Sequence, residues 1–275
     1  MGMTIELGRV GIFRVATQAD GALAAEVEKL GYGALWLGGS PGGDLAIVEQ
    51  LLDATERLVV ATGIVNIWAD APDGIARAFH RINEKHPDRF LLGIGAGHPE
   101  ATQEYKKPYA ALVEYLDALD AAGVSKQSRV LAALGPKVLK LSGDRTAGAH
   151  PYLVTPEHTR SAREILGDGP LLAPEQKVVL DTDVERARTT GRGGASFYLQ
   201  LSNYVANLRK LGFADEDLAG EGSDRLIDAL ALHGEASTIA DGLRAHLDAG
   251  ADHVIVQALG DDPFPAYRAL AAELL

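Results

Sequence analysis

The chain has 275 residues, of which 47% are hydrophobic and 23% are charged, a globular composition that excludes long disordered, collagen-like or coiled-coil architectures. Its 26 Lys and Arg residues face 38 Asp and Glu residues, giving a formal net charge of −12, so we expect neither nucleic acid nor a membrane surface as a partner. The absence of cysteine excludes disulfides, thiolate catalysis and Cys-ligated metal sites.

Short apolar runs typical of buried strands alternate along the chain with patterns typical of amphipathic helices. In chain order the predicted elements are strand Gly8–Val15, helix Gln18–Leu30, strand Ala34–Leu37, helix Asp44–Arg57, strand Leu58–Ile67, helix Pro72–Lys85, strand Phe90–Gly95, helix Gln103–Ala122, strand Arg129–Leu134, helix Pro136–Ser142, strand Gly148–Leu153, helix Pro156–Leu166, strand His253–Leu259 and helix Pro265–Leu275. Near-continuous apolar strands separated by helices indicate a parallel sheet that is buried on both faces.

About eight such strands predict an α/β fold, a (β/α)8 TIM barrel formed as one domain by residues 1–275. A doubly wound open sheet is the alternative. The stretch Leu171–Ser223 is the least regular part of the chain, and it contains an amphipathic helix near Phe197–Leu211. We interpret this stretch as an insertion before the last strand.

In a barrel, the active site lies at the carboxyl ends of the strands. Glycines collect there, above all in Gly95-Ala96-Gly97, where backbone N–H groups can approach a phosphate closely. The spacing is neither that of the Rossmann fingerprint nor that of a Walker loop, and a tight turn explains the same glycines about equally well. Asn66 ends the third strand, where its amide either binds a planar heterocycle or caps the following loop.

Proton donors are expected at the same strand ends, and His98, His150 and Tyr152 are the candidates. The other histidines show no metal-ligand spacing, so we predict no metal site. No Ser–His–Asp arrangement with a nucleophile-elbow sequence is present.

The sequence resembles the bacterial luciferase-like flavin and deazaflavin oxidoreductases, and particularly their coenzyme F420-dependent branch. The segments that carry the resemblance are AAEVEKLGYGALW (residues 24–36), ATGIVN (61–66), PDRFLLGIGAG (87–97), AALGPK (132–137) and AGADHVIV (249–256). They occur in the family's order over nearly the whole chain. The resemblance implies a (β/α)8 barrel with an isoalloxazine-like ring lying across the strand ends.

The resemblance also implies roles for individual residues. By it, Gly95, Ala96 and Gly97 form the loop beside the cofactor phosphate, Leu134 and Gly135 form the next such loop, Asn66 contacts the ring, and a cis peptide bond between Gly63 and Ile64 buttresses the ring. Several family members that oxidise alcohols carry an acidic residue and a histidine at the end of the second strand. This chain has Gly39 and Ser40 there, which argues against an alcohol oxidation that needs a strong base at that point, although Ser40 can still bind the ring or a substrate oxygen.

We therefore expect an oxidoreductase that transfers a hydride between coenzyme F420 and a small organic substrate. The alternatives are a luciferase-like monooxygenase that uses flavin mononucleotide (FMN), a deazaflavin-binding protein without turnover, and a non-redox barrel enzyme acting on a sugar phosphate. No apolar run is long enough to span a bilayer, and Met1–Arg14 lacks the pattern of a signal peptide or a myristoylation site. We expect a cytoplasmic protein that forms a homodimer.

Overall fold

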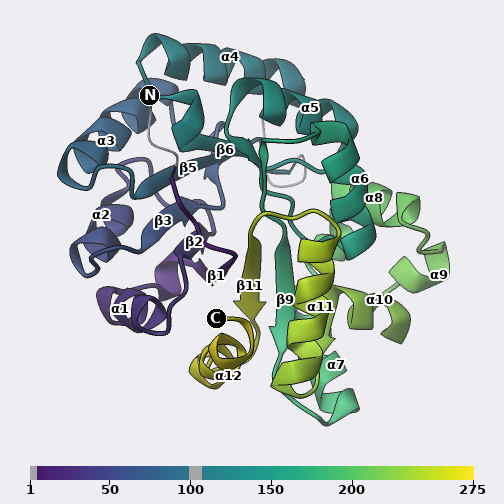
Figure 1. Ribbon diagram of the computed structural model, residues 1–275. Helices are drawn as coiled ribbons and strands as arrows, with labels where there is room; N and C mark the ends of the chain where they lie inside the picture. Colours follow the sequence, from purple (N-terminus) through teal and green to yellow (C-terminus); the bar gives the residue numbers. More distant parts are fainter. Residues whose placement is uncertain (1–4, 99–106) are drawn as a thin grey trace.

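The computed structural model describes residues 5–98 and 107–275 (Figure 1). The strands are β1 (Val10–Val15), β2 (Ala34–Gly38), β3 (Val59–Thr62), β4 (Val65–Asn66), β5 (Phe90–Gly95), β6 (Arg129–Leu131), β7 (Gly148–Ala149), β8 (Leu171–Leu172), β9 (Glu175–Val179), β10 (Ala231–His233) and β11 (Val254–Ala258). The helices are α1 (Gly21–Lys29), α2 (Ala46–Asp53), α3 (Pro72–Lys85), α4 (Pro108–Ala121), α5 (Pro136–Arg145), α6 (Pro156–Leu166), α7 (Val184–Ala195), α8 (Ser202–Lys210), α9 (Asp215–Leu218), α10 (Asp224–Leu230), α11 (Ala236–Asp248) and α12 (Phe264–Leu274).

The strands form a parallel sheet that curls into a barrel. From β1 the pairing runs through β2, β3, β5, β6 and β7 on one side, while β1 pairs with β11 on the other. The segment 171–179 closes the ring, because β8 pairs with β7 and β9 pairs with β11. When β3 with β4, and β8 with β9, are each counted as one interrupted strand, the described residues fill eight positions around the barrel. Strand β10 pairs in addition with the carboxyl-terminal residues of β9, Lys177 to Val179. The predicted (β/α)8 fold is confirmed.

The third barrel strand is interrupted between β3 and β4, as the resemblance implied. Both segments pair with β5, and the peptide bond between Gly63 and Ile64 is cis. Only glycine fits at position 93 of β5, next to this interruption, because a Cβ atom there would lie 1.8 Å from the carbonyl oxygen of Thr62. The interruption turns Gly63 and Ile64 toward the carboxyl mouth of the barrel, where both line a cavity.

Two apolar layers hold the barrel together. The larger layer packs the helices against the outside of the sheet. The smaller one fills the barrel interior and includes Trp36 and Phe13, with Trp36 fully buried. The Trp36 indole N–H donates to His253 Nε2 at 3.2 Å, and its ring lies 4.7 Å from the ring of His150. The lower part of the barrel is therefore filled with side chains, and the space available to a ligand lies above them.

The predicted insertion begins too early in the chain. Residues 171–179 are not irregular: they form the strand that closes the barrel, so the prediction that the insertion begins at Leu171 is wrong. Pro174 interrupts the strand, and Glu175 and Lys177 are buried in it as an ion pair, so no apolar run marks it. The insertion begins after β9, and the predicted helix near 197–211 is α8. The first residues of the predicted helix Gln103–Ala122 lie outside the described part of the chain, and its remainder is α4.

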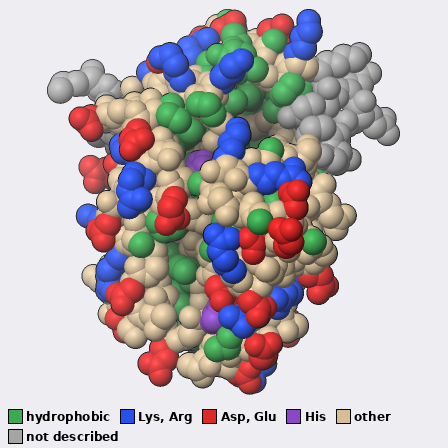
Figure 2. Space-filling model, turned by 90° about the vertical axis from the view of Figure 1, so that its right-hand side faces the viewer, with side chains coloured by type: hydrophobic (Ala, Val, Ile, Leu, Met, Phe, Trp, Pro, Cys, Tyr) green, Lys and Arg blue, Asp and Glu red, His purple; other side chains and the backbone are tan. Residues whose placement is uncertain are grey.

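The surface is charged without a large region of one sign on the face that carries α6, α8, α9 and α10. Figure 2 shows acidic and basic side chains mixed over this face. Within the described residues, no helix is long and apolar enough to cross a membrane.

Candidate active site

A cavity of about 840 Å³ lies at the carboxyl ends of the barrel strands. This volume is in the range of small-molecule and cofactor sites. The predicted site residues that line it are Gly39, Ser40, Gly63, Ile64, Asn66, Ala96, Gly97, His98, Leu134, Gly135, His150 and Tyr152. Gly95 is not part of the lining; a Cβ atom there would lie 3.0 Å from the side chain of Ile64. The structure thus brings these residues to one site, while their roles stay predictions.

Asn66 and Gly97 meet at one end of the cavity. The Asn66 Oδ1 atom accepts a hydrogen bond from the backbone N–H of Trp68 at 3.1 Å, so the amide does cap the following loop. Its Nδ2 atom lies against Gly97, whose φ is +60°, and a Cβ atom on Gly97 would come within 2.9 Å of it. Glycine is therefore required here for both its conformation and its size. Trp68, in the loop after β4, connects to the loop after β5, because its indole N–H donates to the carbonyl of Ala96 at 2.7 Å.

His150 lies at the floor of the cavity. Its Nδ1 atom is 2.9 Å from the carbonyl oxygen of Ala173, and a carbonyl only accepts, so Nδ1 carries the hydrogen. Nε2 is then an acceptor, 3.1 Å from the place of a Cβ atom on Gly63. Burial lowers the pKa of His150 to about 4, against a smaller opposing effect of the Ala173 hydrogen bond. The neutral ring can accept a hydrogen bond from a ligand, but it is a poor proton donor at neutral pH.

We expect this burial to make stability depend on pH. Above pH 6.5 His150 is neutral in the folded and unfolded states, whereas between pH 6.5 and 4 only the unfolded state takes up the proton. Folding should therefore lose on the order of 3 kcal/mol through this residue as the pH falls across that window. Urea unfolding of the wild type and of His150→Gln at pH 7 and pH 4.5 measures it. A variant that loses as much stability as the wild type between the two pH values would contradict this account.

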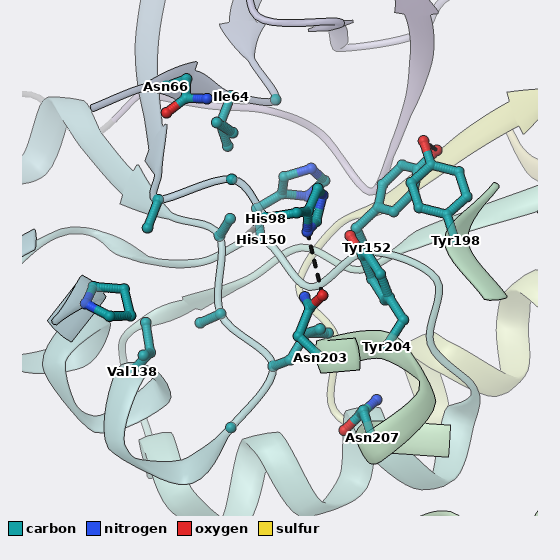
Figure 3. A pocket seen from close by; sticks show the side chains of 18 of the residues that line it. Ile64, Asn66, His98, Val138, His150, Tyr152, Tyr198, Asn203, Tyr204 and Asn207 are labelled. Atoms are coloured by element: carbon teal, nitrogen blue, oxygen red, sulfur yellow. Dashed lines mark hydrogen bonds between the residues drawn. The ribbon is translucent and has the colours of Figure 1, made fainter. Parts of the chain in front are cut away.

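His98 lines the cavity from the loop after β5. Its Nδ1 atom is 3.3 Å from Asn203 Oδ1, and its ring lies 5.3 Å from that of Tyr204. The ring is only partly buried, and Figure 3 shows it projecting between the strand ends and α8. Of the two predicted histidines, His98 is the more exposed, and its role stays a prediction.

Tyr152 belongs to a buried polar cluster at the wall of the cavity. Its hydroxyl donates to Gln257 Oε1 at 2.8 Å and lies 2.9 Å from the hydroxyl of Tyr198. Burial raises the pKa of Tyr152 well above its usual range, and the nearby carboxylate of Glu175 adds to this. The phenol therefore stays protonated, and its hydrogen bond to Gln257 holds this wall of the cavity in place.

Glu175 and Lys177 lie behind Tyr152, and sequence reasoning missed both. Lys177 Nζ is 3.1 Å from Glu175 Oε1 and 4.0 Å from the centre of the Tyr152 ring, and both charged side chains are buried. Glu175 Oε2 also accepts from the backbone N–H of Leu153 at 3.1 Å. Burial raises the pKa of Glu175 and lowers that of Lys177. The one signal that could have found them is two opposite charges at a spacing of two residues, which places both side chains on one face of a strand.

At the end of the cavity away from Asn66, the lining comes from the N-terminus of α5 and from one face of α8 (Figure 3). Helix α5 begins there at Gly135 and Pro136, with Lys137 in its first turn. Opposite it, α8 contributes Asn207 and Lys210. A helix N-terminus and two lysines favour an anionic group. The sequence pointed to Gly135 but not to the lysines or to α8. Within residues 5–98 and 107–275, no group of three His, Asp or Glu side chains could hold a metal ion.

The comparisons with known proteins agree with this geometry. The luciferase-like monooxygenase family model matches residues 15–126. No curated protein matches the sequence.

Among solved structures, the chain is similar to an F420-dependent secondary alcohol dehydrogenase in complex with an F420-acetone adduct, with 15% identity, a TM-score of 0.75, and coverage of 97% of this chain and 98% of that chain. It is similar to the coenzyme F420-dependent tetrahydromethanopterin reductase from Methanopyrus kandleri, with 15% identity, a TM-score of 0.72 and 98% coverage of both chains. It is also similar to the oxygenating constituent of 3,6-diketocamphane monooxygenase from Pseudomonas putida in complex with FMN, with 15% identity, a TM-score of 0.67 and 96% coverage of both chains. Fold and family match together confirm the resemblance to the luciferase-like family, and residues 15–126 carry its sequence signature.

Proposed function

We propose that the protein is an oxidoreductase that transfers a hydride between a deazaflavin, coenzyme F420, and a small organic substrate. The observation that carries the proposal is the lining of the cavity, which has the apolar side chains of Phe13 and Ile64 at one end and an anion-attracting end formed by Gly135 and Lys137. A flat redox ring with an anionic tail has this arrangement of chemical groups. The similarity to F420-dependent and FMN-dependent structures supports a cofactor of this kind.

The residues fit such a group on their own geometry. Gly97 leaves space that a side chain would fill, and Ile64 and Phe13 provide an apolar surface for a ring. When bound, the deazaflavin would supply the hydride chemistry, and the protein would bind, orient and shield it. In this proposal the Nε2 atom of His150 accepts a hydrogen bond at the floor, and His98 exchanges the proton that accompanies the hydride.

Titration of the purified protein with coenzyme F420 and with FMN, followed by absorbance and fluorescence, tests the cofactor. We expect saturable binding of F420 with a spectral change, and reduction of at least one compound in a panel of enones, imines and alcohols. Tight F420 binding without turnover would instead support a carrier or storage role. Failure to bind F420 at all would overturn the proposal.

The second candidate is an FMN-dependent monooxygenase that receives reduced flavin from a partner reductase. Gly39 and Ser40 favour it, because an oxygenase does not need the acidic residue and histidine that alcohol-oxidising relatives carry at that position. Binding of FMN in preference to F420, and oxygen consumption when a flavin reductase is added, would establish it.

Asn66→Ala should weaken cofactor binding about 3- to 10-fold and shift the absorbance of the bound ring, because it removes a hydrogen-bonding group beside the cavity. Asn83→Ala is the matched control. Asn83 Oδ1 also accepts a backbone N–H bond, from Asp88 at 3.3 Å, but Asn83 does not line the cavity. Equal effects of the two variants, or an unchanged spectrum for Asn66→Ala, would dismiss the ring contact.

The expected homodimer and the cytoplasmic location stay predictions, which analytical ultracentrifugation and cell fractionation test.

A further inference from the structure

Helix α8 presents one polar face to the cavity. Asn203, Asn207 and Lys210 all line it, at spacings of four and three residues that place them on the same side of the helix. From Asn203 to Lys210 this row of side chains covers about 10 Å along the helix axis. Figure 3 shows Asn207 and Val138 at the opposite end of the pocket from Asn66 and Ile64.

Asn207 carries a buried donor that needs an acceptor. The residue is only 8% exposed, and its Nδ2 atom has no hydrogen-bond partner among the described residues. Buried amide donors are nearly always paired, because an unpaired one loses its hydration without compensation. Since Asn207 lines the cavity, a ligand in the cavity is the available source of the missing acceptor.

The charges around this end favour an anion. The described residues that line the cavity include Lys137 and Lys210 but no Asp or Glu, although the chain as a whole has a net charge of −12. A concave site lined by one sign of charge concentrates ligands of the opposite sign. The site thus differs from the rest of this acidic molecule.

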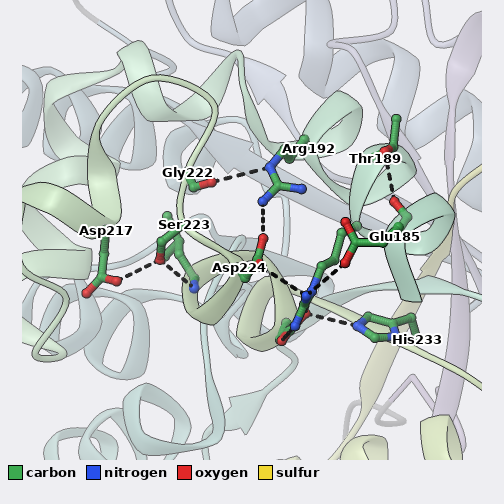
Figure 4. Close-up of polar contacts among 11 residues, drawn as sticks. Glu185, Thr189, Arg192, Asp217, Gly222, Ser223, Asp224 and His233 are labelled. Atoms are coloured by element: carbon green, nitrogen blue, oxygen red, sulfur yellow. Dashed lines mark hydrogen bonds and ion pairs between the residues drawn. The ribbon is translucent and has the colours of Figure 1, made fainter. Parts of the chain in front are cut away.

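The insertion holds α8 in place. Leu208, and Tyr204 at the edge of the cavity, pack in one buried cluster with Leu226 and Leu230 of α10. Helix α10 is tied to α7 by ion pairs: Arg188 contacts Asp228 at 2.7 Å and Asp224 at 2.9 Å, and Arg192 also pairs with Asp224. Figure 4 shows this network, which includes His233. The polar face of α8 is therefore positioned before any ligand binds.

We propose that Asn207 and Lys210 of α8, together with Lys137 of α5, form a subsite for the anionic tail of the deazaflavin cofactor. The proposal rests on the function proposed above. Coenzyme F420 carries a phosphodiester followed by carboxylates, so it offers several anionic acceptors in a row. The row of donors on α8 matches such an extended tail, whereas the single terminal phosphate of FMN engages only one point of it.

The test compares coenzyme F420 with its tail-less deazaflavin riboside, using fluorescence titration of the full-length protein. We expect the wild type to bind F420 at least tenfold more tightly than the riboside, with the difference shrinking as salt is added. Lys210→Gln should weaken F420 binding about 3- to 10-fold, and Asn207→Leu about tenfold or more, while binding of the riboside changes less than twofold. Lys140→Gln is the charge-matched control, because Lys140 lies on the same helix as Lys137 but outside the cavity lining. It should change neither the affinity for F420 nor the affinity for the riboside.

A second measurement separates a binding role from a structural one. Because Asn207→Leu removes an unpaired buried donor, the cofactor-free variant should unfold at the same or a higher temperature than the wild type. Equal affinity of the wild type for F420 and the riboside would overturn the tail subsite and leave the proposed function intact. Equal losses of F420 affinity in Lys210→Gln and Lys140→Gln would also overturn the tail subsite. Absence of binding for both deazaflavins would overturn the proposed function itself.

Discussion

Gly97→Val is expected to lower the affinity for the cofactor by about 100-fold or more. Gly97 has a φ of +60°, and a Cβ atom there would lie 2.9 Å from Asn66 Nδ2 at the edge of the cavity. A β-branched side chain would push this loop out of position and fill space that a ligand needs, and displacement of a binding group by about 1 Å is enough for a loss of this size. Isothermal titration with the cofactor measures the affinity directly.

Gly123→Val is the matched control for this variant. Gly123 has a φ of +78° and follows α4, and a Cβ atom there would meet nothing within 4 Å. Both variants should lose about 1–3 kcal/mol of stability from the left-handed backbone conformation. Only Gly97→Val should lose cofactor binding as well. If Gly123→Val weakens binding equally, the loop of Gly97 has only a structural role.

Lys177→Met should have the largest effect on stability, a loss of about 3–5 kcal/mol near neutral pH. The substitution leaves the Glu175 carboxylate buried without its ion-pair partner, which lies 3.1 Å away in the wild type. Burial already raises the pKa of Glu175, so the orphaned carboxyl should become neutral more readily. A group with a raised folded pKa destabilises the fold as the pH rises above its unfolded pKa, so the loss should grow from pH 5 to pH 8. Urea unfolding across this range measures it.

The double variant Glu175→Gln, Lys177→Met tests whether the unpaired charge is the cause. The amide that replaces the carboxylate keeps an oxygen that can accept the hydrogen bond from the N–H of Leu153, and no buried charge remains at the pair. Most of the lost stability should return, to within about 1 kcal/mol of the wild type. A double variant as unstable as the single one would show that the packing of the lysine stem, rather than its charge, is what matters.

Much of the fold could be predicted where local signals agree with the final environment. The helix Pro72–Lys85 and the strand Phe90–Gly95 occur with the predicted bounds, because a proline opens the helix and an uninterrupted apolar run forms the strand. The closing strand could not be predicted in this way. It is buried like its neighbours, but it places Glu175 and Lys177 in the interior, and their mutual neutralisation is a property of the folded pair.

The candidate site likewise contains residues that could be predicted from the sequence and residues that could not. Gly97 and Gly135 could be predicted because the carboxyl ends of all barrel strands meet at one mouth. The amphipathic pattern of α8 was visible, but a polar helix face ordinarily faces water. Only the packing of Tyr204 and Leu208 on the insertion turns Asn207 and Lys210 toward the cavity.

The filled interior of the barrel also has a kinetic consequence. Trp36, His150 and His253 close the bottom of the cavity, so within the described part of the chain a ligand enters and leaves through the mouth. Two ligands stacked in a blind pocket cannot exchange places: the deeper one must arrive first and depart last. Initial-rate patterns should therefore be those of an obligatory sequence of addition, in which the product that leaves last, from the deeper position, inhibits competitively only toward the deeper ligand.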